Sequence, residues 1–311
     1  MNIFLEMKDM FLNERIANLQ YRFLAFTMAS QQNERGKQME HQLENLRIRW
    51  FNDACYEIKL PNGKGILIDP FIDDSKFRVK SSDDVEAADY ILISHTHFDH
   101  VMDLGKVSRR FDSKIFAGNL SGIELAKYFD IPGYRMNLCG SGDTIFTEDF
   151  KMECFRGKHT KLGEFDRPSN WPENLQKENL KPDAMAMNLA GSYEYLSYLI
   201  TLPSGFRILV WGGGADVDAA MHAKEYRPDI SIAQLPREST DEIACLYAAI
   251  GGRAIFPHHH DTFLEMGEEG LLRIEEVVEK TRQRAPDTMV IRPEKGKWYQ
   301  IVTKVSLLEE E

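Results

Sequence analysis

Cysteine is scarce in this chain, with four among 311 residues, and no two of them form a Cys-x-x-Cys pair. The N-terminal segment carries Glu6, Lys8 and Asp9 within its apolar pattern, so it lacks the uncharged centre of a secretory signal. Without export, cysteines are usually small buried residues rather than disulfide partners. We therefore expect a cytoplasmic protein with reduced, buried thiols at Cys55, Cys139, Cys154 and Cys245.

Long apolar runs and an excess of positive charge are missing as well. No uncharged stretch approaches the ~20 residues that a transmembrane helix requires, so we expect no membrane span. The chain has 38 lysines and arginines and 49 acidic residues, so its net charge is −11. This balance disfavours a broad nucleic-acid-binding surface, although it permits a small basic pocket for an anionic substrate. The 43% hydrophobic content is ordinary for a globular protein.

Phosphate-binding glycine motifs are also absent. Residues 212–214 are three glycines after a predicted strand at 206–211, but they lack the G-x-G-x-x-G spacing and the lysine of a P-loop. Glycines let the backbone approach a ligand or an ion closely. Asp216 or Asp218, just after this run, could then supply a carboxylate that bridges two metal ions.

The clearest positive feature is a short apolar strand at residues 90–93 that runs into three histidines and an aspartate. His95 and His97 leave the strand end on one side, and Asp99 and His100 follow where the chain turns. Imidazole and carboxylate together suit a divalent metal such as zinc. Four candidate ligands in six residues fit two metals, about 3.5–4 Å apart and sharing a water, better than one tetrahedral site. The alternative is a set of surface histidines on a polar loop.

Further candidate ligands follow later strands. His159 comes after two probable strands within 143–155, and a second histidine cluster, residues 258–260, follows a strand at 253–256. Ligands from separated loops at one end of the sheets would be held by a rigid scaffold, while the loops around the site could vary. Asp69 ends the strand at 65–68, where it can orient a metal-bound histidine. The alternatives are a solvated loop histidine at 159 and an ordinary turn residue at 69.

Alternating strands and helices from residue 48 onward indicate an α/β layer arrangement. Residues 161–182 form a long irregular segment, either a cover over the site or a plain surface excursion. Residues 1–46 look helical, and they could be a hairpin packed on the domain, a dimerisation arm or a lid. The main helices predicted after the histidine motif span residues 102–111, 121–129, 238–250 and 271–284.

The run His95-Thr96-His97-Phe98-Asp99-His100 matches H-x-H-x-D-H and resembles the signature of the metallo-β-lactamase superfamily. The segments 48–51, 66–70 and 257–263 are similar to those of its ascorbate-6-phosphate-lactonase-like branch, and the resemblance covers about residues 47–305. It implies an α/β (α+β) fold, the αββα sandwich, with the site at one edge of two mixed sheets. The expected domains are an N-terminal helical extension at 1–46 and the metallo-β-lactamase fold at 47–311.

The resemblance also implies a ligand set. The Pro-x-His register of the branch selects His259 over its two neighbours, His258 and His260. Glycines occupy positions 212 and 213, where the family usually has Gly-Asp, so Asp216 would have to bridge through a longer loop. Asn52 and Asp53 are a second departure, because the branch more often has Gly followed by His or Asn. The implied metal ligands are His95, His97 and His159 for one ion, Asp99, His100 and His259 for the other, and Asp216 between them.

The implied activity is a metal-dependent hydrolase, in which a metal-bound hydroxide attacks a small-molecule ester, lactone or phosphoester. Asp99 would steer the water as well as bind metal, which makes it the candidate catalytic residue. Two divalent ions are expected, zinc or manganese first, and iron also fits. The alternatives are a small-molecule phosphodiesterase and a non-catalytic scaffold on the same fold. We expect a small-molecule substrate, which could be anionic, and no membrane or nucleic-acid partner. We also expect a homo-oligomer, with the N-terminal helices as a candidate interface.

Overall fold

The computed structural model describes residues 45–157, 177, 181–214, 217–235, 238–264, 266–302 and 305–307. Outside these ranges lie residues 1–44 of the helical extension predicted for 1–46, the candidate ligands His159 and Asp216, and most of the 161–182 segment. The boundary at residue 46 and the role of the N-terminal extension therefore stay predictions.

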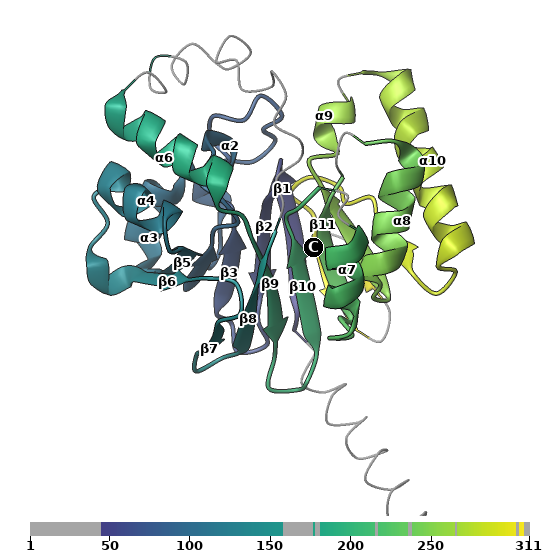
Figure 1. The fold of residues 1–311 in the computed structure, drawn as a ribbon, viewed down its shortest axis with the longest axis horizontal. Coiled ribbons are helices and arrows are strands. Elements are labelled where there is room, and N and C mark those ends of the chain that lie inside the picture. The colour runs from purple at the N-terminus through teal and green to yellow at the C-terminus, as the bar shows by residue number, and fades with distance from the viewer. Residues whose placement is uncertain are drawn as a thin grey trace, which may run out of the picture.

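Two mixed β-sheets lie face to face at the centre of the described chain (Figure 1). The eight-stranded sheet has the order β15-β14-β1-β2-β3-β4-β5-β6, and the seven-stranded sheet has the order β13-β12-β11-β10-β9-β8-β7. The strands of the first sheet are β1 (Arg47–Asn52), β2 (Cys55–Lys59), β3 (Gly65–Ile68), β4 (Tyr90–Leu92), β5 (Lys114–Gly118), β6 (Met136–Cys139), β14 (Trp298–Ile301) and β15 (Val305–Leu307). Those of the second are β7 (Thr144–Phe146), β8 (Lys151–Arg156), β9 (Leu196–Thr201), β10 (Arg207–Trp211), β11 (Ile230–Gln234), β12 (Ala254–His258) and β13 (Met289–Val290).

Helices cover the outer face of each sheet, which completes the αββα sandwich expected from the sequence (Figure 1). The first sheet carries α2 (Phe98–Val101), α3 (Leu104–Phe111), α4 (Ser121–Phe129) and α6 (Pro182–Tyr193). The second carries α7 (Val217–Lys224), α8 (Thr240–Ile250), α9 (Asp261–Leu264) and α10 (Glu268–Arg284). Across the described ranges, none of the helices has both the length and the apolar character needed to cross a bilayer.

The strands alternate between two packing environments, as the two-residue period of a strand requires. Tyr90 and Leu92 of β4 lie in the apolar layer between the sheets, whereas Ile91 packs under the helices of the first sheet. In the second sheet, Val210 faces the layer between the sheets and Leu209 faces the helices. Each sheet is therefore buried on both faces, which explains why its strands read as nearly continuous apolar runs in the sequence.

The helix α6 is not among the helices predicted from the sequence, and it begins at the last residue of the segment expected to be irregular. The helix spans Pro182–Tyr193, and the strand β9 follows at Leu196. Proline is tolerated in the first turn of a helix, so Pro182 marks a helix start rather than a loop. Apolar residues occur all round this helix, because Met187 is buried while Leu189 is exposed. That distribution removed the one-sided pattern by which an amphipathic helix is recognised.

The cysteine expectation is confirmed in part. The four thiols are free, and Cys55, Cys139 and Cys154 are buried. Cys245 is exposed, so the expectation of a buried thiol is wrong there. It lies on α8 between the buried residues Ala244 and Leu246, at a position that faces away from the sheet.

A buried ion pair ties β1 and β2 to the loop before β4. The Glu57 carboxylate accepts hydrogen bonds from the guanidinium of Arg49 at 2.5 Å and from the backbone N–H groups of Glu86 and Ala87, each at 2.9 Å. Arg49 also donates to the carbonyl of Asp84 at 2.8 Å. Glu57 is 0% and Arg49 4% exposed, so neither group can turn to water if its partner is removed.

We expect Glu57→Ala to lower the free energy of unfolding by about 3–5 kcal/mol, because it leaves a buried guanidinium without its carboxylate partner and two backbone N–H groups without an acceptor. Urea unfolding followed by circular dichroism measures the loss. The control is Glu279→Ala, which removes a half-exposed partner of Arg282 on α10 and is expected to cost less than about 1 kcal/mol. Equal losses in the two variants would contradict the buried role of Glu57.

Candidate metal centre

The candidate ligands lie at the carboxyl ends of parallel strands in both sheets. The strands β3, β4 and β5 run parallel in the first sheet, and β10, β11 and β12 run parallel in the second. The histidine motif follows β4, and His258 is the last residue of β12. The two sheets thus bring segments about 160 positions apart to a common edge, between α2 and α9 in Figure 1.

His95, His97 and His100 form a compact buried group. Their residues are 2%, 4% and 2% exposed. The ring centroids of His95 and His100 are 3.9 Å apart, and Nε2 of His95 lies 3.1 Å from Nδ1 of His97. The alternative of surface histidines on a polar loop is therefore wrong for these three residues.

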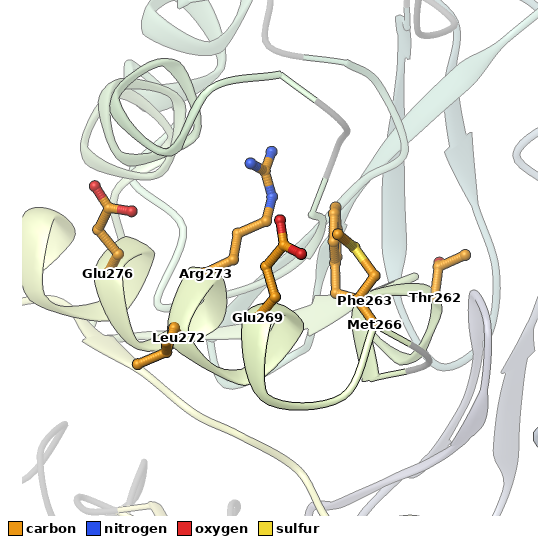
Figure 2. A pocket seen from close by; sticks show the side chains of 7 residues that line it. All are labelled: Thr262, Phe263, Met266, Glu269, Leu272, Arg273 and Glu276. Carbon is orange, nitrogen blue, oxygen red and sulfur yellow. The ribbon is translucent and has the colours of Figure 1, made fainter.

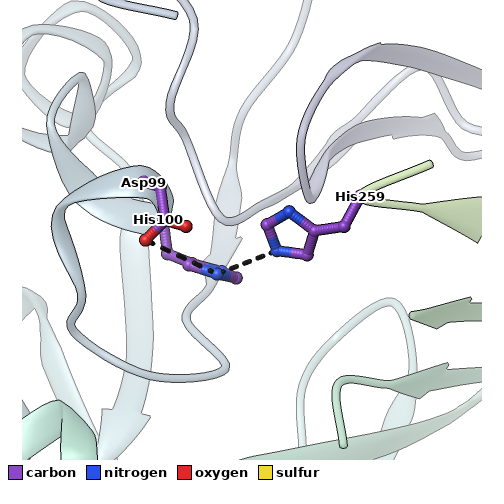
Figure 3. A group of neighbouring side chains, drawn as sticks. All are labelled: Asp99, His100 and His259. Atoms are coloured by element: carbon purple, nitrogen blue, oxygen red, sulfur yellow. Dashed lines mark hydrogen bonds and ion pairs between the residues drawn. The ribbon is translucent and has the colours of Figure 1, made fainter. Parts of the chain in front are cut away.

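His259 reaches this group from the second sheet (Figure 3). Its Nε2 lies 3.2 Å from Nε2 of His100, and the Asp99 carboxylate lies 3.9 Å from the same His100 nitrogen. One potential ligand atom from each of Asp99, His100 and His259 falls within 4.8 Å of the others. Two imidazole nitrogens and a carboxylate at such spacing form a donor set that fits a divalent metal.

Asp69 holds His100 from behind, in the position that the sequence analysis assigned to it. Its carboxylate lies 2.8 Å from Nδ1 of His100 and accepts two hydrogen bonds from Ser94, from the backbone N–H at 2.7 Å and from the hydroxyl at 2.6 Å. Burial opposes protonation of His100, but the carboxylates of Asp69 and Asp99 outweigh it and raise the pKa of the imidazole. A neutral His100 that donates Nδ1–H to Asp69 directs the lone pair of Nε2 at His259.

The two neighbours of His259 make different contacts. His258 is 3% exposed, and its Nε2 bonds to the carbonyl of Trp211 at 3.1 Å. His260 stacks on the Trp50 ring, with centroids 4.1 Å apart. Burial lowers the pKa of His258 to about 3 and that of His260 to about 4, so both are neutral at pH 7. Of the three, His259 lies with Asp99 and His100, at the position that the family register selects.

Asp53 belongs to a buried network that the sequence analysis noted only as a departure from the family pattern. Its carboxylate accepts a hydrogen bond from the Ser75 hydroxyl at 2.6 Å, and its backbone N–H donates to Asp261 at 2.9 Å. Lys295 pairs with the same Asp261 carboxylate at 3.1 Å. Burial, and then the nearby Asp261 charge, raise the pKa of Asp53 to about 8. The carbonyl of Asp53 accepts the backbone N–H of His259 at 3.0 Å, so this turn helps to place the histidine.

Gly212 has a different use from the one expected. A Cβ atom added there would lie 2.5 Å from Cε1 of Tyr195, and one added at Gly157 would lie 2.5 Å from Cδ1 of the same ring. The Tyr195 ring stacks on His95, with centroids 4.3 Å apart. The glycine after β10 thus makes room for an aromatic side chain beside the histidines. No pattern in the sequence pointed to Tyr195, Ser75 or Lys295, because each meets the site only through the tertiary fold.

A cavity of about 590 Å³ lies on the helical side of the second sheet. It is formed by α9, α10 and the turn between them, and Figure 2 shows its side chains. Its lining residues are Thr262, Phe263, Met266, Glu269, Leu272, Arg273 and Glu276, which include no histidine. It adjoins the candidate metal centre through Thr262, whose hydroxyl donates to the carbonyl of His259 at 2.6 Å.

The sequence is similar to known metal-dependent hydrolases. Residues 48–137 match the model of the metallo-beta-lactamase superfamily. A protein of Polynucleobacter asymbioticus named UPF0173 metal-dependent hydrolase is 26% identical over 227 residues, which cover 69% of this chain and 74% of that protein. A protein of the same name from Rubrobacter xylanophilus is 24% identical over 230 residues, which cover 72% of this chain and 86% of the relative.

Solved structures share the fold at low sequence identity. Igni18, a metallo hydrolase from the archaeon Ignicoccus hospitalis, aligns over 86% of this chain and 99% of its own, with a TM-score of 0.58 and 15% identity. An isothiocyanate hydrolase from Delia radicum gut bacteria aligns over 83% of this chain and 99% of its own, with a TM-score of 0.56 and 15% identity. At this identity the likeness concerns the fold alone.

We expect Asp69→Asn to weaken divalent-metal binding about 10–100-fold, because the amide supports His100 less well than the carboxylate does. Competition with a chromophoric chelator measures the affinity for Zn²⁺. The control is Asp103→Asn, a buried aspartate whose carboxylate accepts the backbone N–H groups of Ile72 and Asp73. An unchanged affinity in Asp69→Asn, or an equal loss in both variants, would show that the carboxylate does not support a metal ligand.

Proposed function

The chain belongs to the metallo-β-lactamase superfamily, and from that premise we propose that it is a metal-dependent hydrolase of a small-molecule ester, lactone or phosphoester. The observation that carries the proposal is the 3.2 Å approach of His100 and His259, from different sheets, beside Asp99. The names of the relatives support the same activity.

The donor set supports a centre with two ions. His95 and His97 direct ring nitrogens at each other from one side, and Asp99, His100 and His259 form the second group. The resemblance adds His159 to the first group and Asp216 between the two. Imidazole and carboxylate ligands accept zinc, manganese or iron, and we propose zinc or manganese.

Divalent ions bound there would supply the main chemistry, since they lower the pKa of a coordinated water to about 7 and polarise a carbonyl or phosphoryl oxygen. The exposure of the chain's own side chains indicates which of them contact water and substrate and which only hold the ligands in place. The Asp99 side chain is 41% exposed and that of His100 is 2% exposed, so water and substrate reach Asp99 first. We assign to Asp99 both metal binding and orientation of the attacking water, through a hydrogen bond that its carboxylate accepts. Buried Asp69 keeps His100 in place throughout.

The proposed substrate class rests on the chemistry that such ions would supply. Ions held by these residues would polarise a carbonyl or phosphoryl oxygen, so we propose a substrate that carries an ester, a lactone or a phosphoester. We place the chain with the lactonase-like branch because segments 66–70 and 257–263 are similar to it. The net charge of −11 supports a small molecule rather than a nucleic acid.

The test begins with metal content. We expect about two divalent ions per chain by plasma mass spectrometry. We expect a chelator to abolish hydrolysis of a panel of lactones, nitrophenyl esters and bis-nitrophenyl phosphate, and Zn²⁺ or Mn²⁺ to restore it. Activity that survives complete removal of metal would overturn the proposal.

A single substitution sharpens this test. We expect His97→Ala to lower the turnover of the best substrate at least about 100-fold, because it removes a proposed ligand and the metal with it. The control is His222→Ala, whose side chain is 65% exposed on α7 and pairs with Glu225. Turnover and metal content should stay at the wild-type level in that variant. Unchanged turnover in His97→Ala would rule out the proposed centre.

A further inference from the structure

The helix α6 packs directly on the histidine motif. Its backbone carbonyl at Met187 accepts a hydrogen bond from the Thr96 hydroxyl at 2.7 Å. A Cβ atom added at Gly191 would lie 2.8 Å from the backbone nitrogen of Thr96 and 2.9 Å from that of His97. Only glycine permits this approach, since real Cβ atoms are almost never found so close to backbone atoms. The last turn of α6 is therefore fixed against residues 96 and 97.

The residue after this glycine, Ser192, bonds to the far side of the His97 ring. Its hydroxyl oxygen lies 2.8 Å from Nε2 of His97, while Nδ1 of the same ring lies 3.1 Å from Nε2 of His95. The same hydroxyl lies 3.4 Å from the carbonyl of Asn188, one turn back along the helix, which offers its proton an acceptor. With the proton directed to that carbonyl, the serine oxygen faces His97 as an acceptor.

We propose that Ser192 is a positioning residue that holds His97 in the tautomer with the proton on Nε2. In this tautomer Nε2–H donates to the serine, and the lone pair of Nδ1 points at His95. This inference rests on the proposed function, in which His97 binds metal. Ser192 supports His97 from α6 as Asp69 supports His100 from the end of β3.

Removal of the Ser192 hydroxyl should change both the tautomer of His97 and the affinity for metal. Without the serine acceptor, His97 can place its proton on Nδ1, facing His95, and a metal ion must then displace that proton. Partners of this kind typically contribute 10–100-fold to metal affinity, so we expect Ser192→Ala to weaken binding of Zn²⁺ by roughly that factor. Ser192→Thr keeps a hydroxyl and should retain most of the affinity.

The experiment reads the tautomer directly in the full chain. Long-range ¹H–¹⁵N spectra of histidine-labelled protein, with the His97 signals identified from their loss in His97→Gln, separate the two tautomers. We expect the Nε2–H form in the metal-free wild type and in Ser192→Thr, and a gain of the Nδ1–H form in Ser192→Ala. The control is Tyr193→Phe, which removes a hydroxyl from the adjacent residue, 73% exposed, and should leave the spectrum unchanged.

Two outcomes separate this inference from the proposed function. A wild-type His97 with its proton on Nδ1, or a Ser192→Ala spectrum identical to the wild type, overturns the role of Ser192 whatever the protein binds. Wild-type protein that binds neither Zn²⁺ nor Mn²⁺ overturns the proposed function, and the spectra still decide which tautomer the serine selects. Thermal unfolding of each variant excludes a loss of fold as the cause.

Discussion

The approach of His100 and His259 is the constraint on which the site depends. The two nitrogens lie 3.2 Å apart although their residues come from different sheets, so the edge of the sandwich must be set to a fraction of an ångström. Left-handed backbone at Asp53, Asp69 and His259, with φ of 46°, 44° and 58°, makes the turns that bring these residues together. Such conformations are uncommon for residues other than glycine, and they persist only where the surrounding contacts determine them. Here the hydrogen bonds to Ser94, Ser75 and Asp261 supply those contacts.

Three histidines at this edge are each supported from a different element. Asp69 at the end of β3 supports His100, Ser192 of α6 supports His97, and the Asp53 turn holds the backbone of His259. A rigid frame of this kind orients ring nitrogens before any ligand arrives, which lowers the cost of binding. Asp99 differs because its side chain is 41% exposed, so the buried frame has one open side where water and substrate can enter.

The similarity to known proteins is uneven along the chain. The superfamily match at 48–137 contains Asp53, Asp69 and the first histidine cluster, whereas α6 and His259 lie beyond it. The matched part thus carries one wall of the site, and residues from outside it complete the other wall.

The sequence by itself determined the α/β layering, the first histidine cluster and the supporting place of Asp69, because strand periodicity and short-range spacing are local properties. The family resemblance added the αββα sandwich and His259, which the fold places beside Asp99 and His100. Only the tertiary structure decided that a helix, α6, follows the 161–182 segment, that Ser192 meets His97, and that Lys295 and Asp261 anchor the Asp53 turn. His97 and Ser192 are 95 positions apart in the sequence, and Asp53 and Asp261 are 208 positions apart. No local pattern encodes such pairs, because they form only when whole sheets and helices have packed.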